Sequence, residues 1–230
     1  MKEPIATSQS WPILRLDFYD TAVIMTQWKN NGQLLAYPVS IDDVVSACSS
    51  MTLSSGLLPA NTLFWQQQAD QMALGIYVPA RRWPMQTEHR SYLVPMPPLV
   101  FVGNGTSYSI FAVKKRPSSL SRAQAKGEHN RLYHAPCPNV HTHGSICQGN
   151  TPFPRCSPQN ILTALSLFME ESLFNADLSR SKCVSRPEDV RELWAELDGR
   201  KRFPLSELVP SHTSLEALIS NVDTDNGFNV

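Results

Sequence analysis

The sequence has no long apolar run, no excess of either charge and no internal repeat. No stretch of its 230 residues approaches the length of a membrane-spanning helix, and the opening Met1-Lys2-Glu3-Pro4 lacks the apolar core of a signal peptide. The 20 basic residues balance 20 acidic ones, which argues against general binding to nucleic acid or to membrane surfaces. We therefore expect a cytoplasmic protein with no membrane partner and no direct nucleic-acid partner.

Glycine and cysteine are also scarce. The 10 glycines against 18 prolines indicate extended, turn-bounded segments rather than a helical bundle. The five cysteines are an odd number, which is not typical of a secreted disulfide framework, so reduced thiols are expected. The chain is long enough to bury a sizeable core, with or without a smaller appended unit.

Residues 1–58 are predicted to form a β-rich extension with one helix. Ser40 followed by Asp43 is typical of a helix N-cap with an acidic partner, so a helix is expected to begin there. Before it, three runs have the composition of strands: 13–19, 21–28 and 33–39.

Residues 59–180 are predicted to form the core of the protein, in which an antiparallel sheet precedes a helix. Asn104-Gly105 predicts a hairpin turn between the last two strands. Prolines within 92–101 require either an edge strand or two short strands joined by an extended kink. The four strand candidates are 62–66, 73–78, 92–101 and 108–113.

A basic link over residues 114–131 joins the last strand to the central motif. It is interpreted either as a solvated loop or as a docking surface for an acidic partner. Beyond the motif, Ser157-Pro158 predicts the start of a helix that reaches about residue 175.

Further helices are predicted over residues 181–222. Ser185 and Glu188 have the spacing of a capping box, and Thr213 with Glu216 indicates a short third helix. The tail 223–230 is expected to be disordered. Strands, then the motif, then helices define an α+β fold class.

The central motif, residues 137–147, supports two chemistries. The first is a zinc site, because cysteine and histidine are the ligands that zinc prefers. However, no pair has the tight spacing of a structural zinc site, and His141 and His143 alternate, so an extended chain would point them in opposite directions. The candidate ligands are Cys137, His141, His143, Cys147 and Cys156.

The second chemistry is acyl transfer through a cysteine thioester. It needs a reachable thiol and a hydrogen-bond donor aimed at the tetrahedral oxyanion. Cys147 would supply the thiol and Asn139 the donor, with Pro138 and Gly144 shaping the turn between them. The plainer alternatives are a buried, inert Cys147 and an Asn139 that only forms a turn.

The string Cys-Pro-Asn-Val-x-x-x-Gly-Ser-Ile-Cys resembles the ubiquitin-conjugating enzyme motif His-Pro-Asn-Ile/Val-x-x-x-Gly-x-Ile-Cys. The chain as a whole resembles the PRTRC system protein B family, a bacterial ubiquitin-conjugating-enzyme-like group. The broad resemblance covers about residues 62–178, and the motif is its most specific part. Other stretches that carry it are Val94-Pro-Met-Pro-Pro-Leu-Val-Phe-Val-Gly, Leu132-Tyr-His-Ala-Pro, Gly149-Asn150, Ser157-Pro158-Gln159 and Phe174-Asn-Ala-Asp-Leu178.

The resemblance implies a ubiquitin-conjugating-enzyme-like fold in which Cys147 forms the thioester and Asn139 stabilises the oxyanion. Cys137 stands where the family has a histidine that braces the turn, and Gln148 stands where leucine is usual. The acidic residue that many family members place near an incoming lysine cannot be assigned. His134, His141 and His143 are candidates to ease proton removal from an amine, but each is more commonly a loop or packing histidine.

The implied partners are a ubiquitin-like protein, an adenylating activating enzyme and a metalloprotease-type deconjugating enzyme, with no cofactor. The alternative is a non-catalytic adaptor that binds a ubiquitin-like protein or the activating enzyme; a zinc-binding module ranks lower. The target protein, the acceptor residue and the oligomeric state are not encoded in any recognisable motif.

Overall fold

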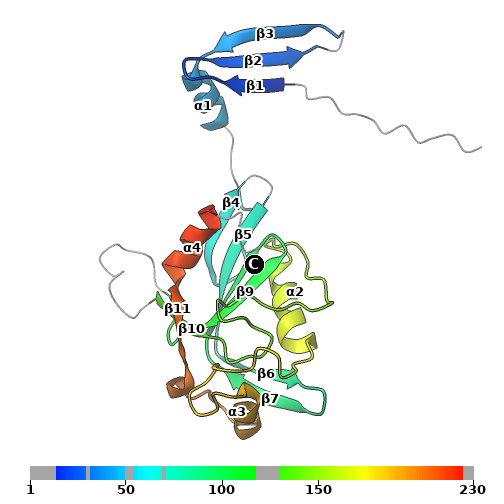
Figure 1. Cartoon of the computed structure of the whole chain (residues 1–230), viewed down its shortest axis with the longest axis vertical. Helices are drawn as coiled ribbons and strands as arrows, with labels where there is room; N and C mark the ends of the chain where they lie inside the picture. The colour runs from blue at the N-terminus through cyan, green and yellow to red at the C-terminus, as the bar shows by residue number, and fades with distance from the viewer. Residues whose placement is uncertain (1–13, 30–31, 50–53, 69–70, 118–129, 225–230) are drawn as a thin grey trace, which may run out of the picture. The chain divides into compact units, whose positions relative to one another are not determined.

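The computed structural model of the chain describes residues 14–29, 32–49, 54–68, 71–117 and 130–224. The chain divides into two compact units, Met1–Ser54 and Ser55–Val230, whose elements are labelled in Figure 1. The tail predicted to be disordered is residues 223–230. The prediction is wrong for its first two residues, which end the helix α4 (Leu215–Thr224), and residues 225–230 lie outside the described residues, as does most of the basic link. No helix in the described segments is long and apolar enough to cross a membrane.

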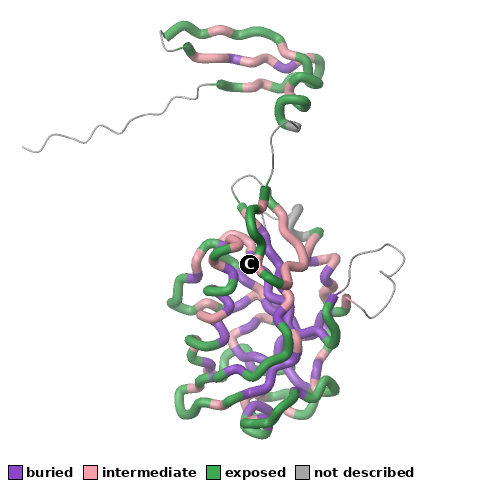
Figure 2. Tube along the Cα trace, turned by 180° about the vertical axis from the view of Figure 1, so that it is seen from behind, coloured by how far each residue is buried: buried purple, intermediate pink, exposed green. Residues whose placement is uncertain are grey.

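The smaller unit is a three-stranded antiparallel meander followed by a helix. The oxygen Oγ of Ser40 accepts a 3.0 Å hydrogen bond from the backbone N–H of Asp43, so the predicted N-cap is confirmed. Most of this unit's described residues are exposed or half-buried, in contrast to the larger unit (Figure 2). Its elements are β1 (Leu14–Phe18), β2 (Val23–Trp28), β3 (Leu34–Val39) and α1 (Ile41–Ser49).

The larger unit is built on a six-stranded sheet in which every neighbouring pair is antiparallel. The predicted hairpin at Asn104-Gly105 is confirmed, and Gly105 takes the left-handed conformation that the turn requires, with φ of 57°. The short strands β10 and β11 were not predicted. In spatial order the strands are β11 (Pro210–Ser214), β10 (Arg131–His134), β9 (Ser107–Ala112), β8 (Leu99–Asn104), β5 (Gln71–Val78) and β4 (Thr62–Gln68).

The proline-containing run 92–101 is two strands, as one of the two predicted alternatives required. Its first half is β7 (Ser91–Met96), which pairs with β6 (Arg81–Gln86) in a separate hairpin. The chain breaks at Pro97-Pro98, because proline cannot donate to a strand ladder, and then continues as β8.

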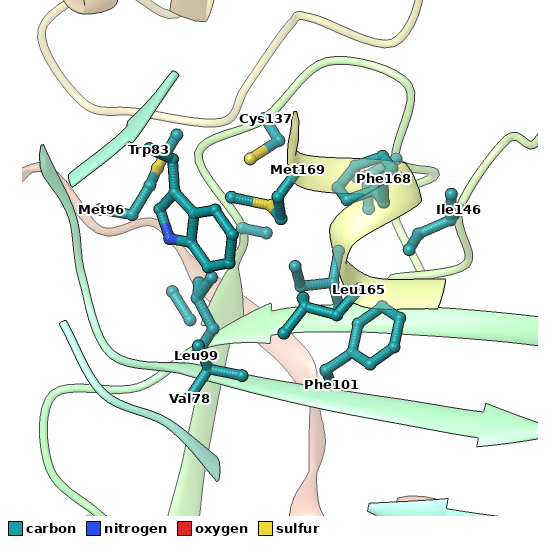
Figure 3. Packing of buried hydrophobic residues seen from close by; sticks show 14 of the residues in the cluster. Val78, Trp83, Met96, Leu99, Phe101, Cys137, Ile146, Leu165, Phe168 and Met169 are labelled. Atoms are coloured by element: carbon teal, nitrogen blue, oxygen red, sulfur yellow. The ribbon is translucent and has the colours of Figure 1, made fainter. Parts of the chain in front are cut away.

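Both faces of the central sheet are covered. Phe101 of β8 faces one cluster, which includes Trp83, Leu165 and Met169 (Figure 3). Val100 of the same strand faces the other cluster, together with buried residues of the helix α4 (Leu215–Thr224). Alternation along β8 therefore places apolar side chains on both faces, and the unit has helical layers on either side of the sheet.

The first helix keeps the predicted capping residue, and the second does not. The Oγ of Ser157 accepts a 3.1 Å hydrogen bond from the N–H of Asn160, ahead of α2 (Ile161–Ser166), which continues as a π-helical turn, Leu167–Glu171. The second, α3 (Val190–Leu197), is capped by Asp189, which accepts from the N–H of Arg191 at 3.0 Å, so the predicted capping box at Ser185 is wrong. Asp189 directly precedes the buried residues of the helix, and the chain at Ser185 is still irregular.

Candidate active site

The central motif forms a tight hairpin, residues 139–147, which we call the motif hairpin. Val140 and Ile146 pair as an antiparallel bridge, and the N–H of Cys147 donates to the carbonyl of Asn139 at 2.8 Å. At the tip, the N–H of Gly144 donates to the carbonyl of His141 at 2.9 Å. Asn139 and Cys147 are thus direct neighbours across the hairpin, although seven residues separate them in sequence.

The motif hairpin is attached to the sheet along β9. The N–H of Ile110 donates to the carbonyl of Gly144, and the N–H of Ile146 donates to the carbonyl of Tyr108, both at 2.9 Å. Gly144 has φ of 92°, and a Cβ there would lie 2.0 Å from the ring of Phe111. Only glycine satisfies both the left-handed backbone and the close approach, so this residue anchors the hairpin to the sheet.

Cys147 is the exposed thiol of the motif. Of the cysteines in the described residues, Cys147 and Cys48 are exposed, whereas Cys137, Cys156 and Cys183 are buried. An acyl donor as large as a protein can reach only an exposed thiol, so the geometry of Cys147 is suited to nucleophilic chemistry.

Asn139 is held by three hydrogen bonds. Besides accepting from Cys147, its backbone N–H donates to the carbonyl of Asp177 at 3.0 Å, and its Nδ2 donates to the carbonyl of Leu173 at 3.2 Å. Its φ of 59° is the left-handed conformation that asparagine tolerates better than most residues. One amide hydrogen of Nδ2 is used in the bond to Leu173, and the second has no hydrogen-bond partner within the described residues.

Cys137, at the position of the family's histidine, does not face the site. Its side chain is fully buried in the apolar cluster, beside Met169 in Figure 3. Burial raises the pKa of its thiol to about 12, although the nearby Lys182 opposes the shift. The thiol therefore stays protonated. Because it faces the apolar cluster, Cys137 does not brace the turn as the histidine of the family motif does, and other residues hold the turn.

Lys182 is a buried lysine that contacts the motif hairpin, and no sequence pattern indicated it. It is 2% exposed, and its Nζ donates to the carbonyl of His141 at 3.4 Å. Burial lowers its pKa from 10.5 to about 8, with the neighbouring Cys137 opposing. The surrounding Ser-Arg-Ser-Lys-Cys string is typical of a solvated loop, so only the tertiary structure identifies this contact.

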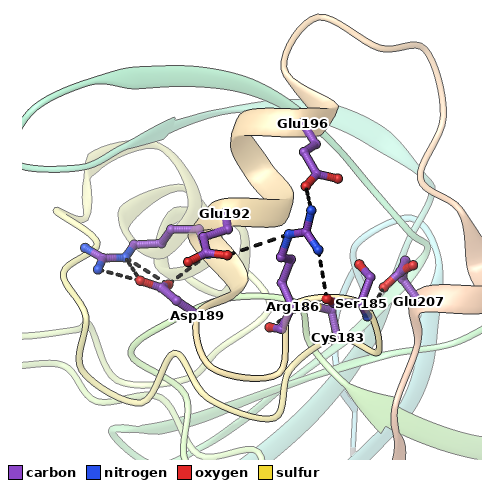
Figure 4. Close-up of polar contacts among 8 residues, drawn as sticks. Cys183, Ser185, Arg186, Asp189, Glu192, Glu196 and Glu207 are labelled. Atoms are coloured by element: carbon purple, nitrogen blue, oxygen red, sulfur yellow. Dashed lines mark hydrogen bonds and ion pairs between the residues drawn. The ribbon is translucent and has the colours of Figure 1, made fainter.

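The C-terminal segment also contacts the chain next to the motif. The indole Nε1 of Trp194 donates to the carbonyl of Pro136 at 2.9 Å in the buried core. The segment is held together by polar contacts around α3: Arg186 pairs with Glu192 at 3.6 Å and with Glu196, and Glu207 accepts from the N–H of Ser185 at 2.8 Å (Figure 4).

The histidines of the motif are arranged differently from the prediction. The rings of His141 and His143 stack, with centroids 5.3 Å apart and an angle of 16° between the planes. The expectation of opposite directions is wrong because the chain turns at His141 instead of continuing extended. Burial lowers the pKa of both His134 and His143, which favours the neutral imidazole at physiological pH.

The zinc alternative gains no support from the geometry. Within the described segments, no three His, Cys, Asp or Glu side chains are close enough to hold a metal ion. Two of the five candidate ligands, Cys137 and Cys156, are buried, and burial raises the pKa of both thiols. A thiol must lose its proton to bind zinc, so this environment opposes metal binding at both.

Asp177 borders the site and was not predicted as a functional residue. It is exposed, its carbonyl accepts a hydrogen bond from the backbone N–H of Asn139, and its carboxylate accepts from Nδ2 of Asn175 at 2.8 Å.

Gln148 holds the chain that follows Cys147. Its Nε2 donates to the carbonyl of Thr106 at 2.7 Å, which connects this part of the chain to the β8–β9 turn.

The larger unit is thus an α+β fold with an antiparallel sheet, a motif hairpin with an exposed cysteine and a following helix. The chain matches the model of prokaryotic E2 family D over residues 40–211, and it belongs to that family. This match confirms the resemblance to a PRTRC-type bacterial group of E2-like proteins. It extends beyond residues 62–178 at both ends, so α1 and the C-terminal segment with α3 lie within the family match. No curated protein and no solved structure matches the chain.

Proposed function

We propose that this protein accepts a ubiquitin-like protein as a thioester on Cys147 and transfers it to an amine. The observation that carries the proposal is the backbone pairing of an exposed Cys147 with Asn139 inside the family motif. Membership of an E2-like family supports a ubiquitin-like protein and an adenylating activating enzyme as the partners. A metalloprotease-type deconjugating partner is proposed from the sequence resemblance.

The reaction has two acyl transfers. In the first, the thiolate of Cys147 attacks the thioester that links the ubiquitin-like protein to the activating enzyme; a new C–S bond forms, and the enzyme's thiolate leaves. In the second, an amine attacks the Cys147 thioester, an amide forms, and the Cys147 thiolate leaves and takes up the proton that the amine releases. Both steps pass through a tetrahedral oxyanion, which the second N–H of the Asn139 amide is proposed to stabilise.

Asp177 is proposed to orient the incoming amine. Its carboxylate is exposed, and its backbone is bonded to Asn139, so the residue is held at the edge of the site rather than on a free loop. A carboxylate near the thioester favours the binding of a lysine ammonium and can accept its proton. This assigns the acidic role that the sequence alone left open.

The alternative function is an adaptor that binds the ubiquitin-like protein or the activating enzyme without chemistry. The hydrogen bond from Asn139 to the carbonyl of Leu173 favours it, because a residue that braces a loop needs no catalytic role. In that case an accessible Cys147 thiol is not required, and binding survives its removal.

A single-turnover charging assay separates the two functions. The protein is mixed with a cognate ubiquitin-like protein, its activating enzyme and ATP, and the products are resolved on a non-reducing gel. Wild type and Cys48→Ala should form a thiol-sensitive adduct, and Cys147→Ala should not; Cys48 is the matched control because it is also exposed. An adduct that persists in Cys147→Ala, or tight binding with no adduct in wild type, contradicts the carrier function.

A further inference from the structure

A cavity of about 380 Å³ lies between the turn before β6, the Pro97-Pro98 kink and the segment after α3. All three parts belong to the larger unit. The cavity does not include Cys147 or Asn139, so it is separate from the candidate active site.

Four cations and no carboxylate line this cavity: Arg81, Lys114, Lys201 and Arg202. Lys201 and Arg202 are exposed, and neither has an ion pair within the described part of the chain. Arg81 shares its charge with Glu170 at 2.9 Å, so it contributes less. The chain has no net charge, which means that this positive potential is a local feature of the cavity rather than a property of the whole surface.

Two further exposed basic residues lie at the start of the basic link. Lys115 and Arg116 directly follow Lys114 and are also exposed. A second basic segment, Lys201 and Arg202, lines the same cavity as Lys114, although it lies 87 positions further along the sequence (201 − 114). This favours the interpretation of the basic link as part of a docking surface.

The residues that line the cavity besides the four cations are all apolar, and we call them its floor. They include Met96 and Phe203, which are buried, as well as Pro97 and Pro98. Phe203 is only 8% exposed, so it offers no open aromatic face on which a nucleobase could stack. An aliphatic or aromatic side chain is a better fit to such a floor than a nucleic acid is.

We propose that this basic cavity is a docking site for an acidic segment of a partner protein, with one or two apolar side chains between its carboxylates. The carboxylates pair with Lys114, Lys201 and Arg202 at the rim, and the apolar side chain occupies the floor. The rim charges speed association and select the partner, while the buried apolar contact slows dissociation. The site requires no chemistry at Cys147, so it stands independently of the proposed function.

The test uses a short fluorescein-labelled peptide in which glutamates flank a Leu-Phe pair, with binding to the full chain followed by fluorescence anisotropy. Lys201→Glu/Arg202→Glu should weaken binding about tenfold or more, because two attractions become repulsions. The matched control, Arg131→Glu/Arg180→Glu, has the same net charge but changes exposed arginines that do not line the cavity, and it should change affinity less than about twofold. Replacing Leu-Phe by Gly-Gly in the peptide should weaken binding several-fold, and Cys147→Ala should bind as wild type does.

Three results would overturn the proposal. The first is the absence of saturable binding to wild type at low salt up to about 1 mM protein, a concentration that captures even weak complexes. The second is an equal loss of affinity in the control variant and the cavity variant, which would indicate a non-specific charge effect. Tighter binding of a labelled polyuridylate than of the peptide, lost in the cavity variant, would assign the site to nucleic acid instead.

Discussion

The indole N–H of Trp194 donates a buried 2.9 Å hydrogen bond to the carbonyl of Pro136, directly before the central motif. The two residues are 58 positions apart, and Trp194 lies on α3, which falls within the match to prokaryotic E2 family D. The C-terminal segment therefore helps to hold the central motif, together with Lys182, whose Nζ donates to the carbonyl of His141 in the motif hairpin. These contacts brace the turn whose usual histidine is replaced by the buried Cys137.

Trp194→Phe should lower the free energy of unfolding by about 1–3 kcal/mol more than Trp83→Phe does, because only the former leaves a buried carbonyl without its donor. Trp83 is the matched control: it is 2% exposed, and its Nε1 has no hydrogen-bond partner among the described residues. Urea denaturation measures both variants. Equal losses of stability would mean that the hydrogen bond to Pro136 does not stabilise the fold, and that both losses come from the smaller volume of the phenylalanine ring.

Gly144→Ala should detach the motif hairpin from β9. The added Cβ meets the ring of Phe111 at 2.0 Å and is strained at φ of 92°, so a loss of about 1–3 kcal/mol is expected. Gly105→Ala is the control, because it also has positive φ but meets nothing within 4 Å. If the two variants unfold at the same urea concentration, the contact with Phe111 does not secure the hairpin.

Asn139→Ala should slow discharge of a preformed Cys147 thioester onto free lysine by about a hundred- to a thousandfold, the usual effect of removing one oxyanion donor. The variant also loses the bond to the carbonyl of Leu173, so its unfolding free energy must be measured in parallel. A less stable variant with an unchanged discharge rate would leave Asn139 with the bracing role alone.

Asp177→Asn should slow discharge onto lysine by about ten- to a hundredfold while leaving charging of Cys147 unchanged. The substitution removes the charge and keeps the shape, and the backbone bond to Asn139 is retained. Glu188→Gln, at another exposed carboxylate, should leave both steps unaffected. Equal slowing of charging and discharge by Asp177→Asn would indicate a structural effect instead.

Lys182 should make stability depend on pH in a predictable direction. Its pKa is lowered in the folded state to about 8 from 10.5, so the unfolded chain binds more protons between these values. The contribution of Lys182 to the free energy of unfolding therefore rises with pH between these two values, by up to about 1.4 kcal/mol per pH unit. Below pH 8 the lysine is charged in both states, and its burial lowers the free energy of unfolding by the full amount.

The comparison with Lys182→Met isolates this contribution, because the buried thiols act in the opposite direction. The pKa of Cys137 is raised to about 12 and that of Cys156 to about 11, so both lower stability as pH rises above 9 in either protein. The variant should be more stable than wild type at pH 7, and the difference should shrink towards pH 10. A difference that does not change with pH would mean that the lysine is not desolvated in the folded protein.

Local sequence patterns determined much of the scaffold. The hairpin at Asn104-Gly105, the cap at Ser40 and the strand break at Pro97-Pro98 depend on backbone conformations and donors that single residues impose, so they could be predicted from adjacent positions. The resemblance to the ubiquitin-conjugating enzyme motif also indicated Asn139 and Cys147 as candidates, and the fold joins their backbones by a hydrogen bond.

The tertiary structure decided what surrounds those residues. The strands β10 and β11 form because neighbouring strands offer them ladder partners, and Lys182, Trp194 and Asp177 reach the motif only through long-range packing. Burial of Cys137, the stacking of His141 on His143 and the basic cavity have the same origin. No local propensity encodes these contacts, because each joins segments whose approach is fixed by the shared core.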